Sequence, residues 1–154
     1  MLLYRGSDHG WKYKDFHSRA DNKGPTITFF KVKETGRRCG GFTSISWDTS
    51  YSFKKDTTAF LFSLENKLHF PVKNTDYAIR CRSNYGPTFG SGNGDLSAYD
   101  ETFNSGNNCR SNSEKPSYMI ENDGNGKNGL TGVNGSNFNA SEIECFQVVF
   151  VPAV

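Results

Sequence analysis

The sequence lacks a strong excess of charge of either sign. Its 18 basic and 16 acidic residues leave a formal net charge of +2, and so weak a field does not predict a nucleic-acid or membrane surface. The basic residues are also dispersed, as in the pair Arg80 and Arg82, and solvated strand ends explain such pairs better than a phosphate-binding patch. Apolar runs of membrane-spanning length are missing too. We therefore expect no nucleic-acid partner and no direct membrane insertion.

Cysteine is scarce and widely spaced. Cys39, Cys81, Cys109 and Cys145 form no CxxC pair, which excludes zinc-ribbon and thioredoxin-like sites. Their even number is compatible with two disulfides, but the N-terminal stretch MLLYRGSDHG runs out of apolar residues too early for a signal peptide. The better prediction is four free thiols in an intracellular, cytoplasmic protein.

Two of the cysteines have the neighbours of a reactive thiol. Cys39 follows Arg37 and Arg38, whose charges would lower the pKa of its thiol, and Cys109 lies beside Arg110 in a loop that we expect to be exposed. For Cys39 the alternative is burial as a small apolar side chain, which is the commoner fate of a free cysteine.

Histidine is rare, and recognised cofactor motifs are missing. His9, His17 and His69 are too scattered to predict a metal site. The stretch GSGNGD at 90–95 has an aspartate where a dinucleotide loop needs glycine, and ENDGNGKNG at 121–129 lacks key positions of phosphate and calcium loops. Both stretches are interpreted as glycine turns. No metal, cofactor or catalytic residue is expected.

One pair of carboxylates stands close together in the sequence. Glu142 and Glu144 are two residues apart on a predicted strand, so both should point to the same face. They fit an acid/base pair, but a polar strand face or a partner contact is the better interpretation.

Aromatic residues are plentiful, and they favour a β-rich core. Hydrophobic content is only 34%, yet aromatics reach 14% with 13 Phe, so a few large rings must supply the core. Alternating apolar residues predict a short strand at 1–6, two hairpins at 24–47 and 59–72, a strand at 77–81 and a buried strand at 141–151. A short helix is expected from Trp11 to Asp21.

These elements predict a mainly β, single-domain chain over 1–154, folded as a two-sheet antiparallel β-sandwich with short flanking helices. The Asn/Ser/Gly-rich segment 101–137 is expected to be an ordered loop anchored by Tyr118, Met119, Leu130 and Phe138. In the first hairpin, Gly40 and Gly41 would weaken a strand unless a close approach or a bulge requires them there.

Several blocks of sequence resemble a known family. LLYRGSDHGWKYKDFH, KGPTITFFK, GGFTSISW, FLFSL, YGPTFGSGNGDLSAYD and FNASEIECFQV are similar, in this order, to the TLDc domain, from Leu2 to about Val149. The resemblance implies a TLDc-like β-sandwich, a role in resistance to oxidative damage and, as in several members, contact with the vacuolar proton-pumping ATPase. The family implies no agreed active site. Its usual helical sequence before LLYR is not seen, which indicates a trimmed domain or a divergent, protist member.

Three hypotheses for function follow. The first is a non-catalytic protein-interaction module, with the contact candidates Asp8, His9, Gly40, Gly41, Gly90, Gly92, Asp95, Glu142 and Glu144. The second is a structural component of a large protist or ciliary assembly. The third is a thiol-based, peroxide-reactive enzyme that uses Cys39 or Cys109.

Overall fold

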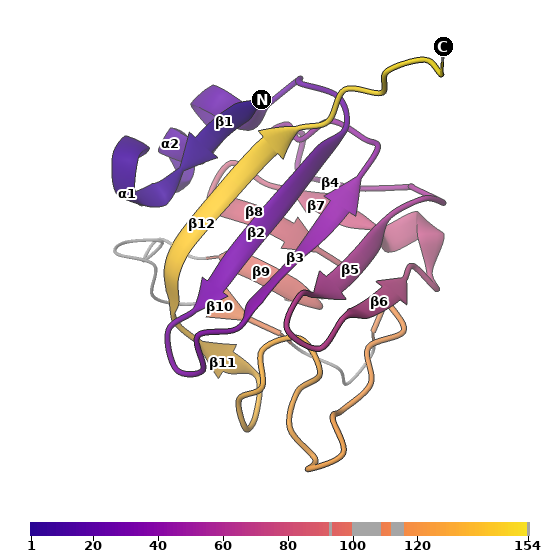
Figure 1. Cartoon of the computed structure of the whole chain (residues 1–154). Helices are drawn as coiled ribbons and strands as arrows, with labels where there is room; N and C mark the ends of the chain where they lie inside the picture. The colour runs from indigo at the N-terminus through magenta and orange to yellow at the C-terminus, as the bar shows by residue number, and fades with distance from the viewer. Residues whose placement is uncertain (93, 100–108, 112–115, 154) are drawn as a thin grey trace.

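The computed structural model describes residues 1–92, 94–99, 109–111 and 116–153, and its strands form two antiparallel sheets of six strands each (Figure 1). Sheet I has the order β1 (Leu2–Arg5), β12 (Ala140–Gln147), β2 (Thr26–Val32), β3 (Arg38–Thr43), β5 (Phe60–Ser63), β6 (Leu68–Pro71). Sheet II has the order β11 (Asn137–Phe138), β10 (Cys109–Arg110), β9 (Leu96–Tyr99), β8 (Tyr85–Phe89), β7 (Ile79–Cys81), β4 (Ser52–Lys54). The predicted mainly β, two-sheet fold is confirmed.

Three short helices accompany the sheets. They are α1 (Gly6–His9), α2 (Tyr13–Ala20) and the 3-10 helix η1 (Thr75–Tyr77). Figure 1 shows α1 and α2 beside β1, at one edge of sheet I. The helix expected over 11–21 is therefore present, and the turn expected at Asp8–Gly10 is the end of α1.

The first hairpin forms the centre of sheet I. Strand β2 pairs with β12 on one side and with β3 on the other. Thr26, Thr28, Phe30 and Val32 face inward, while Ile27 and Phe29 face outward and are half-buried. The strand is therefore lined by apolar groups on both sides.

The glycine pair in β3 allows two different close approaches, one on each face of the sheet. A Cβ at Gly40 would lie 1.9 Å from the carbonyl oxygen of Thr28 and 2.7 Å from the ring of Phe62. A Cβ at Gly41 would lie 2.6 Å from the ring of Phe89 in sheet II. Because the β2–β3 register runs without a shift, the glycines serve close packing and not a bulge.

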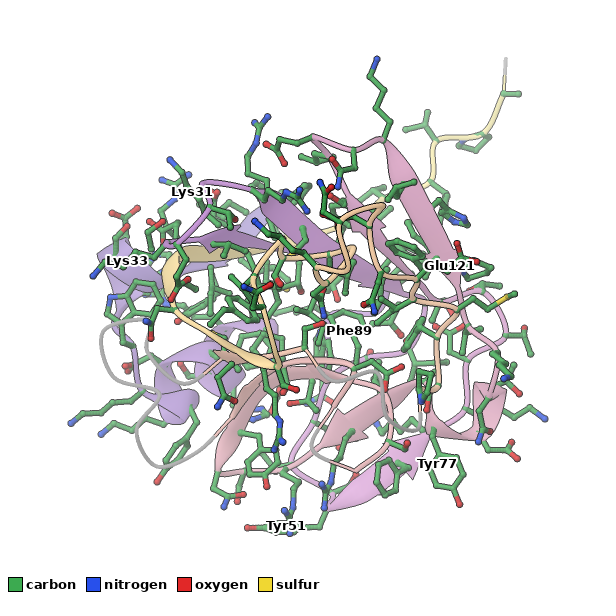
Figure 2. The ribbon with its side chains drawn as sticks, turned by 90° about the horizontal axis from the view of Figure 1, so that it is seen from below. Lys31, Lys33, Tyr51, Tyr77, Phe89 and Glu121 are labelled. Carbon is green, nitrogen blue, oxygen red and sulfur yellow. The ribbon has the colours of Figure 1, made fainter. Side chains whose placement is uncertain are left out.

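Large rings fill the space between the sheets, as the composition predicted. Phe89 makes an edge contact with Trp47 at 5.3 Å between centroids, and Trp47 makes another with Phe16 at 5.8 Å. The indole of Trp47 donates to Thr26 Oγ1 at 3.0 Å, and the hydroxyl of Tyr118 donates to the Ala78 carbonyl at 2.6 Å. Figure 2 shows Phe89 in the interior.

Three local predictions need correction. The last strand ends at Gln147, opposite Thr26, and Val149 is exposed. The Val148 N–H still donates to the Pro25 carbonyl at 2.9 Å, but Pro25 has no N–H to donate in return, so the ladder stops there. Met119 is also exposed, whereas its fellow anchors Tyr118, Leu130 and Phe138 are buried. The expected polar loop at 48–58 contains a short edge strand, β4.

Candidate functional site

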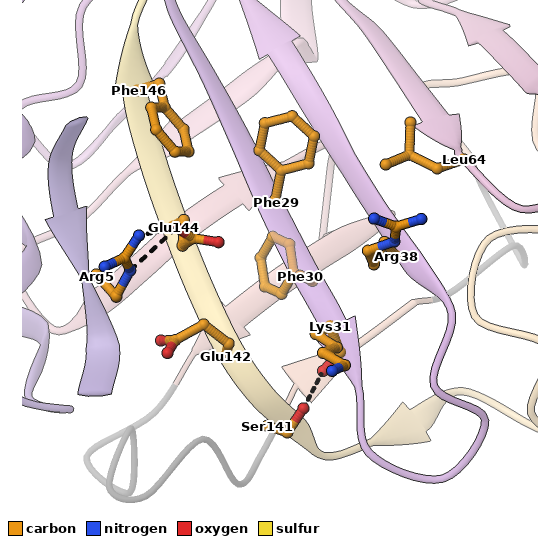
Figure 3. A pocket seen from close by; sticks show the side chains of 10 residues that line it. All are labelled: Arg5, Phe29, Phe30, Lys31, Arg38, Leu64, Ser141, Glu142, Glu144 and Phe146. Carbon is orange, nitrogen blue, oxygen red and sulfur yellow. Dashed lines mark hydrogen bonds and ion pairs between the residues drawn. The ribbon is translucent and has the colours of Figure 1, made fainter. Parts of the chain in front are cut away.

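The outer face of sheet I is hollowed across its central strands. The larger hollow has a volume of about 650 Å³ and is lined by Arg5, Phe29, Phe30, Lys31, Arg38, Leu64, Ser141, Glu142, Glu144 and Phe146 (Figure 3). A smaller hollow of about 330 Å³ shares Phe29 and Leu64 with it and continues toward β6. Together they form one recessed surface, which we call the sheet I hollow.

A row of phenylalanines crosses this face. Phe146 on β12 meets Phe29 on β2 at 5.8 Å between centroids, and Phe29 meets Phe62 on β5 at 5.3 Å, both edge to face. Phe60 continues the row and stacks on Phe42 at 5.3 Å. We call these five residues the phenylalanine row. The sequence predicted the strands that carry these rings but did not identify the row as a surface.

Gly40 makes the centre of the row possible. It lies directly opposite both Phe29 on β2 and Phe62 on β5, so its missing side chain leaves the space in which those two rings meet. Gly40 and Gly41 are both buried. Their assignment as partner contacts is therefore corrected: they shape the sheet from within, and neither presents atoms to a partner.

Charged groups collect at the β1 end of the hollow. The Arg5 guanidinium donates to Glu144 at 2.8 and 3.0 Å and to Asp8 at 3.1 Å. Glu142 accepts from the Ser7 backbone N–H at 3.1 Å and from the Ser7 hydroxyl. Glu142 and Glu144 thus share a face, as predicted, and Figure 3 shows both beside Arg5.

His9 does not line the hollow, but it contacts Arg5 at this end. Its Nδ1 accepts the Arg5 backbone N–H at 2.9 Å, and its ring lies 6.2 Å from that of Tyr4. The structure therefore brings together four of the predicted contact residues, namely Asp8, His9, Glu142 and Glu144.

The candidates at 90–95 lie elsewhere. Asp95 is 1% exposed, and its carboxylate accepts the Tyr118 N–H at 2.8 Å, while Gly90 is packed directly against it. Burial raises the pKa of Asp95 to about 7 against the effect of its backbone hydrogen bonds. Of this group only Gly92 is exposed. The prediction that Gly90 and Asp95 are surface contacts is therefore wrong. Both residues are buried, and Asp95 holds the backbone at Tyr118 in place.

Both reactive-thiol candidates are buried. Burial raises the pKa of Cys39 to about 12, Glu65 adds to this effect, and the charge of Arg37 does not overcome it. Cys109, which we expected to be exposed, lies in β10 between β9 and β11, and burial raises its pKa well above the usual range. Neither thiol has the exposure or the lowered pKa that a reactive cysteine requires.

Metal-binding clusters and membrane-spanning helices are both absent from the described ranges. No three His, Cys, Asp or Glu side chains gather there in a way that could hold a metal ion. None of the helices in these same ranges is long and apolar enough to cross a membrane.

Comparison with known proteins places most of the chain in one family. A family model described as the TLDc domain matches residues 1–149 of the 154. Comparison with curated proteins gave no match. The residues matched by the family model include all strands of both sheets described above.

Proposed function

Because the chain belongs to the TLDc domain family, we propose that it is a non-catalytic protein-interaction module, linked to resistance to oxidative damage, that binds the vacuolar proton-pumping ATPase. The observation that carries the proposal is the sheet I hollow with its phenylalanine row. The family supplies the link to oxidative damage and the choice of partner. The protein acts inside the cell and reaches the vacuolar membrane through that partner.

The composition of the hollow suits a protein surface. Its floor consists of half-buried rings, such as Phe29 and Phe146, and its border carries Arg5, Arg38 and Glu142. An apolar centre surrounded by charged groups is typical of protein–protein interfaces. Aromatic anchors at such a centre supply most of the binding energy, while charges at the edge orient the partner.

The two alternative functions have less support. The thiol enzyme requires an accessible thiolate, and the buried positions of Cys39 and Cys109 argue against it. A structural role in a large assembly would use the same kind of surface, and no observation favours it over the regulatory role. The experiment below distinguishes the two by the partner that is bound.

The test uses Leu64, which is exposed at the junction of the two hollows. The domain and its Leu64→Glu variant are immobilised and presented with solubilised vacuolar membranes from the same organism, and retained proton-pump subunits are quantified by mass spectrometry. Because a charge at the apolar centre must be desolvated on binding, the variant should retain roughly tenfold less pump or worse.

The matched control is Val149→Glu, which introduces the same charge at an exposed apolar residue beyond the last strand. It should retain the pump as the parent does, and both variants should unfold at the parent's temperature. If the parent retains no pump subunit, the choice of partner is wrong. If Leu64→Glu binds the pump as tightly as Val149→Glu, the choice of surface is wrong.

A further inference from the structure

The outer face of sheet II carries a second cluster, made of arginine and aromatic side chains. We call it the arginine–aromatic patch, and its members are Tyr51, Phe53, Tyr77, Arg80, Arg82 and Tyr85. Figure 2 shows Tyr51 and Tyr77 projecting on the side of the molecule away from Lys31, which lies on the outer face of sheet I. The exposed fractions of Tyr51, Phe53 and Tyr77 are 60%, 37% and 40%, so these rings are open to solvent.

The rings hold the two guanidinium groups in place. Arg80 lies 5.0 Å from the ring centre of Phe53, its direct partner across the β4–β7 ladder, and 5.5 Å from that of Tyr85. Arg82 lies 4.9 Å from the same Tyr85 ring and 5.4 Å from that of Tyr51. Such cation–π contacts limit the rotamers of both arginines before any ligand arrives, which lowers the entropy cost of binding.

Among the described residues, the carboxylates nearest to Arg80 and Arg82 pair with other cations. Asp48 pairs with Lys54, and Asp76 lies 3.8 Å from Lys55. Within the described part of the chain, no carboxylate lies within ion-pair distance of either arginine. Burial, followed by the nearby charge of Arg82, lowers the pKa of Arg80. The two guanidinium groups are therefore held close together without an anion.

Most of the hydrogen-bonding capacity of these groups remains for a ligand. A guanidinium has about five N–H donors. Arg80 donates to the carbonyl of Gly92, and Arg82 donates to the Tyr85 hydroxyl at 3.0 Å. The surroundings of both guanidinium groups are the rings of Phe53, Tyr85 and Tyr51.

The backbone at Tyr51 is held in an unusual conformation. Its φ is +58°, in the left-handed region that favours glycine, and its hydroxyl accepts the Ser83 hydroxyl at 2.8 Å. A bulky residue rarely adopts this conformation, and such residues gather at functional sites. This conformation keeps the Tyr51 ring beside Arg82.

We propose that the arginine–aromatic patch binds an extended acidic segment of a protein, whose carboxylates at alternate positions meet Arg80 and Arg82. Residues two apart in extended chains are separated by about 7 Å, so the spacing of the two arginines matches that of alternate side chains in the ligand. A carboxylate fits the guanidinium fork with two parallel hydrogen bonds. Apolar side chains of the segment pack on Tyr77 and Phe53.

The patch suits a peptide better than other polyanions. In the described part of the chain, the positive charge of the patch that has no carboxylate partner comes from Arg80 and Arg82, because Lys54 and Lys55 pair with Asp48 and Asp76. A nucleic acid requires a longer positive track that neutralises several phosphates, and a membrane surface requires about four or more clustered basic residues. The inference does not rest on the proposed function, since the patch and the sheet I hollow lie on opposite faces.

The test measures binding of a synthetic peptide of about ten residues with glutamate at alternate positions and tyrosine between them. Titration calorimetry and NMR shifts of the patch residues are recorded at about 0.15 M salt. The parent should bind this peptide and not its glutamine analogue. Arg80→Gln/Arg82→Gln should weaken binding at least tenfold, and Arg80→Lys/Arg82→Lys should restore it only in part, because lysine keeps the charge but loses the fork.

The control is Lys23→Gln/Lys33→Gln, which removes the same net charge from exposed positions just before and just after β2. It should bind the acidic peptide as the parent does. Three results would overturn the proposal: no binding of the acidic peptide by the folded parent, equal weakening by the lysine control, or binding of an oligonucleotide or phosphatidylserine vesicles in preference to the peptide. None of these results bears on retention of the proton pump by the sheet I hollow.

Discussion

On the outer face of sheet I the arginines beside the phenylalanine row are paired with carboxylates, whereas on sheet II Arg80 and Arg82 lie against aromatic rings. Arg5 contacts Glu144 and Asp8, and Arg38 contacts Glu65. The two faces also differ in their rings, which interlock on sheet I and surround cations on sheet II. Sheet I thus presents an apolar surface with its charge balanced at the edge, and sheet II presents positive charge held ready for an anion.

The largest effect is expected from Gly40→Ala, which disrupts the packing on the outer face of sheet I. The new Cβ would lie 1.9 Å from a backbone oxygen of β2, so the two strands would have to move apart. We expect the free energy of unfolding to fall by about 3 kcal/mol or more, measured by urea denaturation.

The control for this prediction is Gly124→Ala. An added Cβ at Gly124 meets no heavy atom within 4 Å, and its stability should equal that of the parent. If the free energy of unfolding of Gly40→Ala equalled that of the parent, β2 and β3 would not be spaced as described.

An intermediate effect is expected from truncating one ring on each face. Phe62 is 7% exposed and contacts two other rings of the row, so Phe62→Ala should cost about 2 kcal/mol. Phe53 on sheet II is more exposed, and Phe53→Ala should cost less than about 1 kcal/mol while weakening the acidic peptide. The stability of each variant is compared with that of the parent by thermal denaturation. Equal costs would mean that the sheet II rings serve stability rather than binding.

The smallest effect concerns the pH dependence of the sheet II face. Both ring nitrogens of His17 on α2 lie against acceptors: Asp21 Oδ1 at 2.7 Å from Nδ1, and the Arg82 and Tyr85 carbonyls at 2.7 and 2.8 Å from Nε2. Burial acts to lower the pKa of His17, but the carboxylate of Asp21 and the two carbonyls outweigh it, and the pKa is raised above its ordinary 6.5. When it is protonated, the ring donates from both nitrogens and connects α2 to the segment that carries Arg82 and Tyr85.

A raised pKa in the folded state sets the direction of this effect. The stabilisation is fully present below the unfolded-state pKa and is lost as pH rises through the folded-state pKa. His17→Gln should cost about 1–2 kcal/mol at about pH 6 and less at about pH 9, measured by urea denaturation across that range. Parallel curves for parent and variant would show that His17 is not charged in the folded protein.

Much of the fold could be predicted because its signals are local. Alternation of apolar residues located the hairpin of β2 and β3 and the hairpin of β5 and β6. The short β4 was missed because its three residues, one of them an exposed Phe53, carry no clear alternation. The exposure of Cys109 was predicted wrongly, since burial in β10 depends on flanking strands far away in the sequence.

The candidate site was predicted only in part. Glu142 and Glu144 were expected to share a face because strands have a period of two, and they do. Their contacts with Ser7 and Arg5 join residues more than a hundred positions apart, and no spacing rule reveals such a pairing. Gly90 and Asp95 were predicted to be exposed for the same reason. The segment at Tyr118, which packs against Asp95, lies 23 positions further along the chain.

The sequence by itself determined the mainly β class, the aromatic core and the first hairpin, since strand period and ring content are properties of the chain in sequence order. Only the tertiary structure decided which glycine leaves room for the rings on the outer face of sheet I and which thiols are buried. It also decided which arginines contact carboxylates and which contact aromatic rings. Those outcomes depend on which strands become neighbours, and neighbours in a sheet are set by contacts between residues far apart in the sequence.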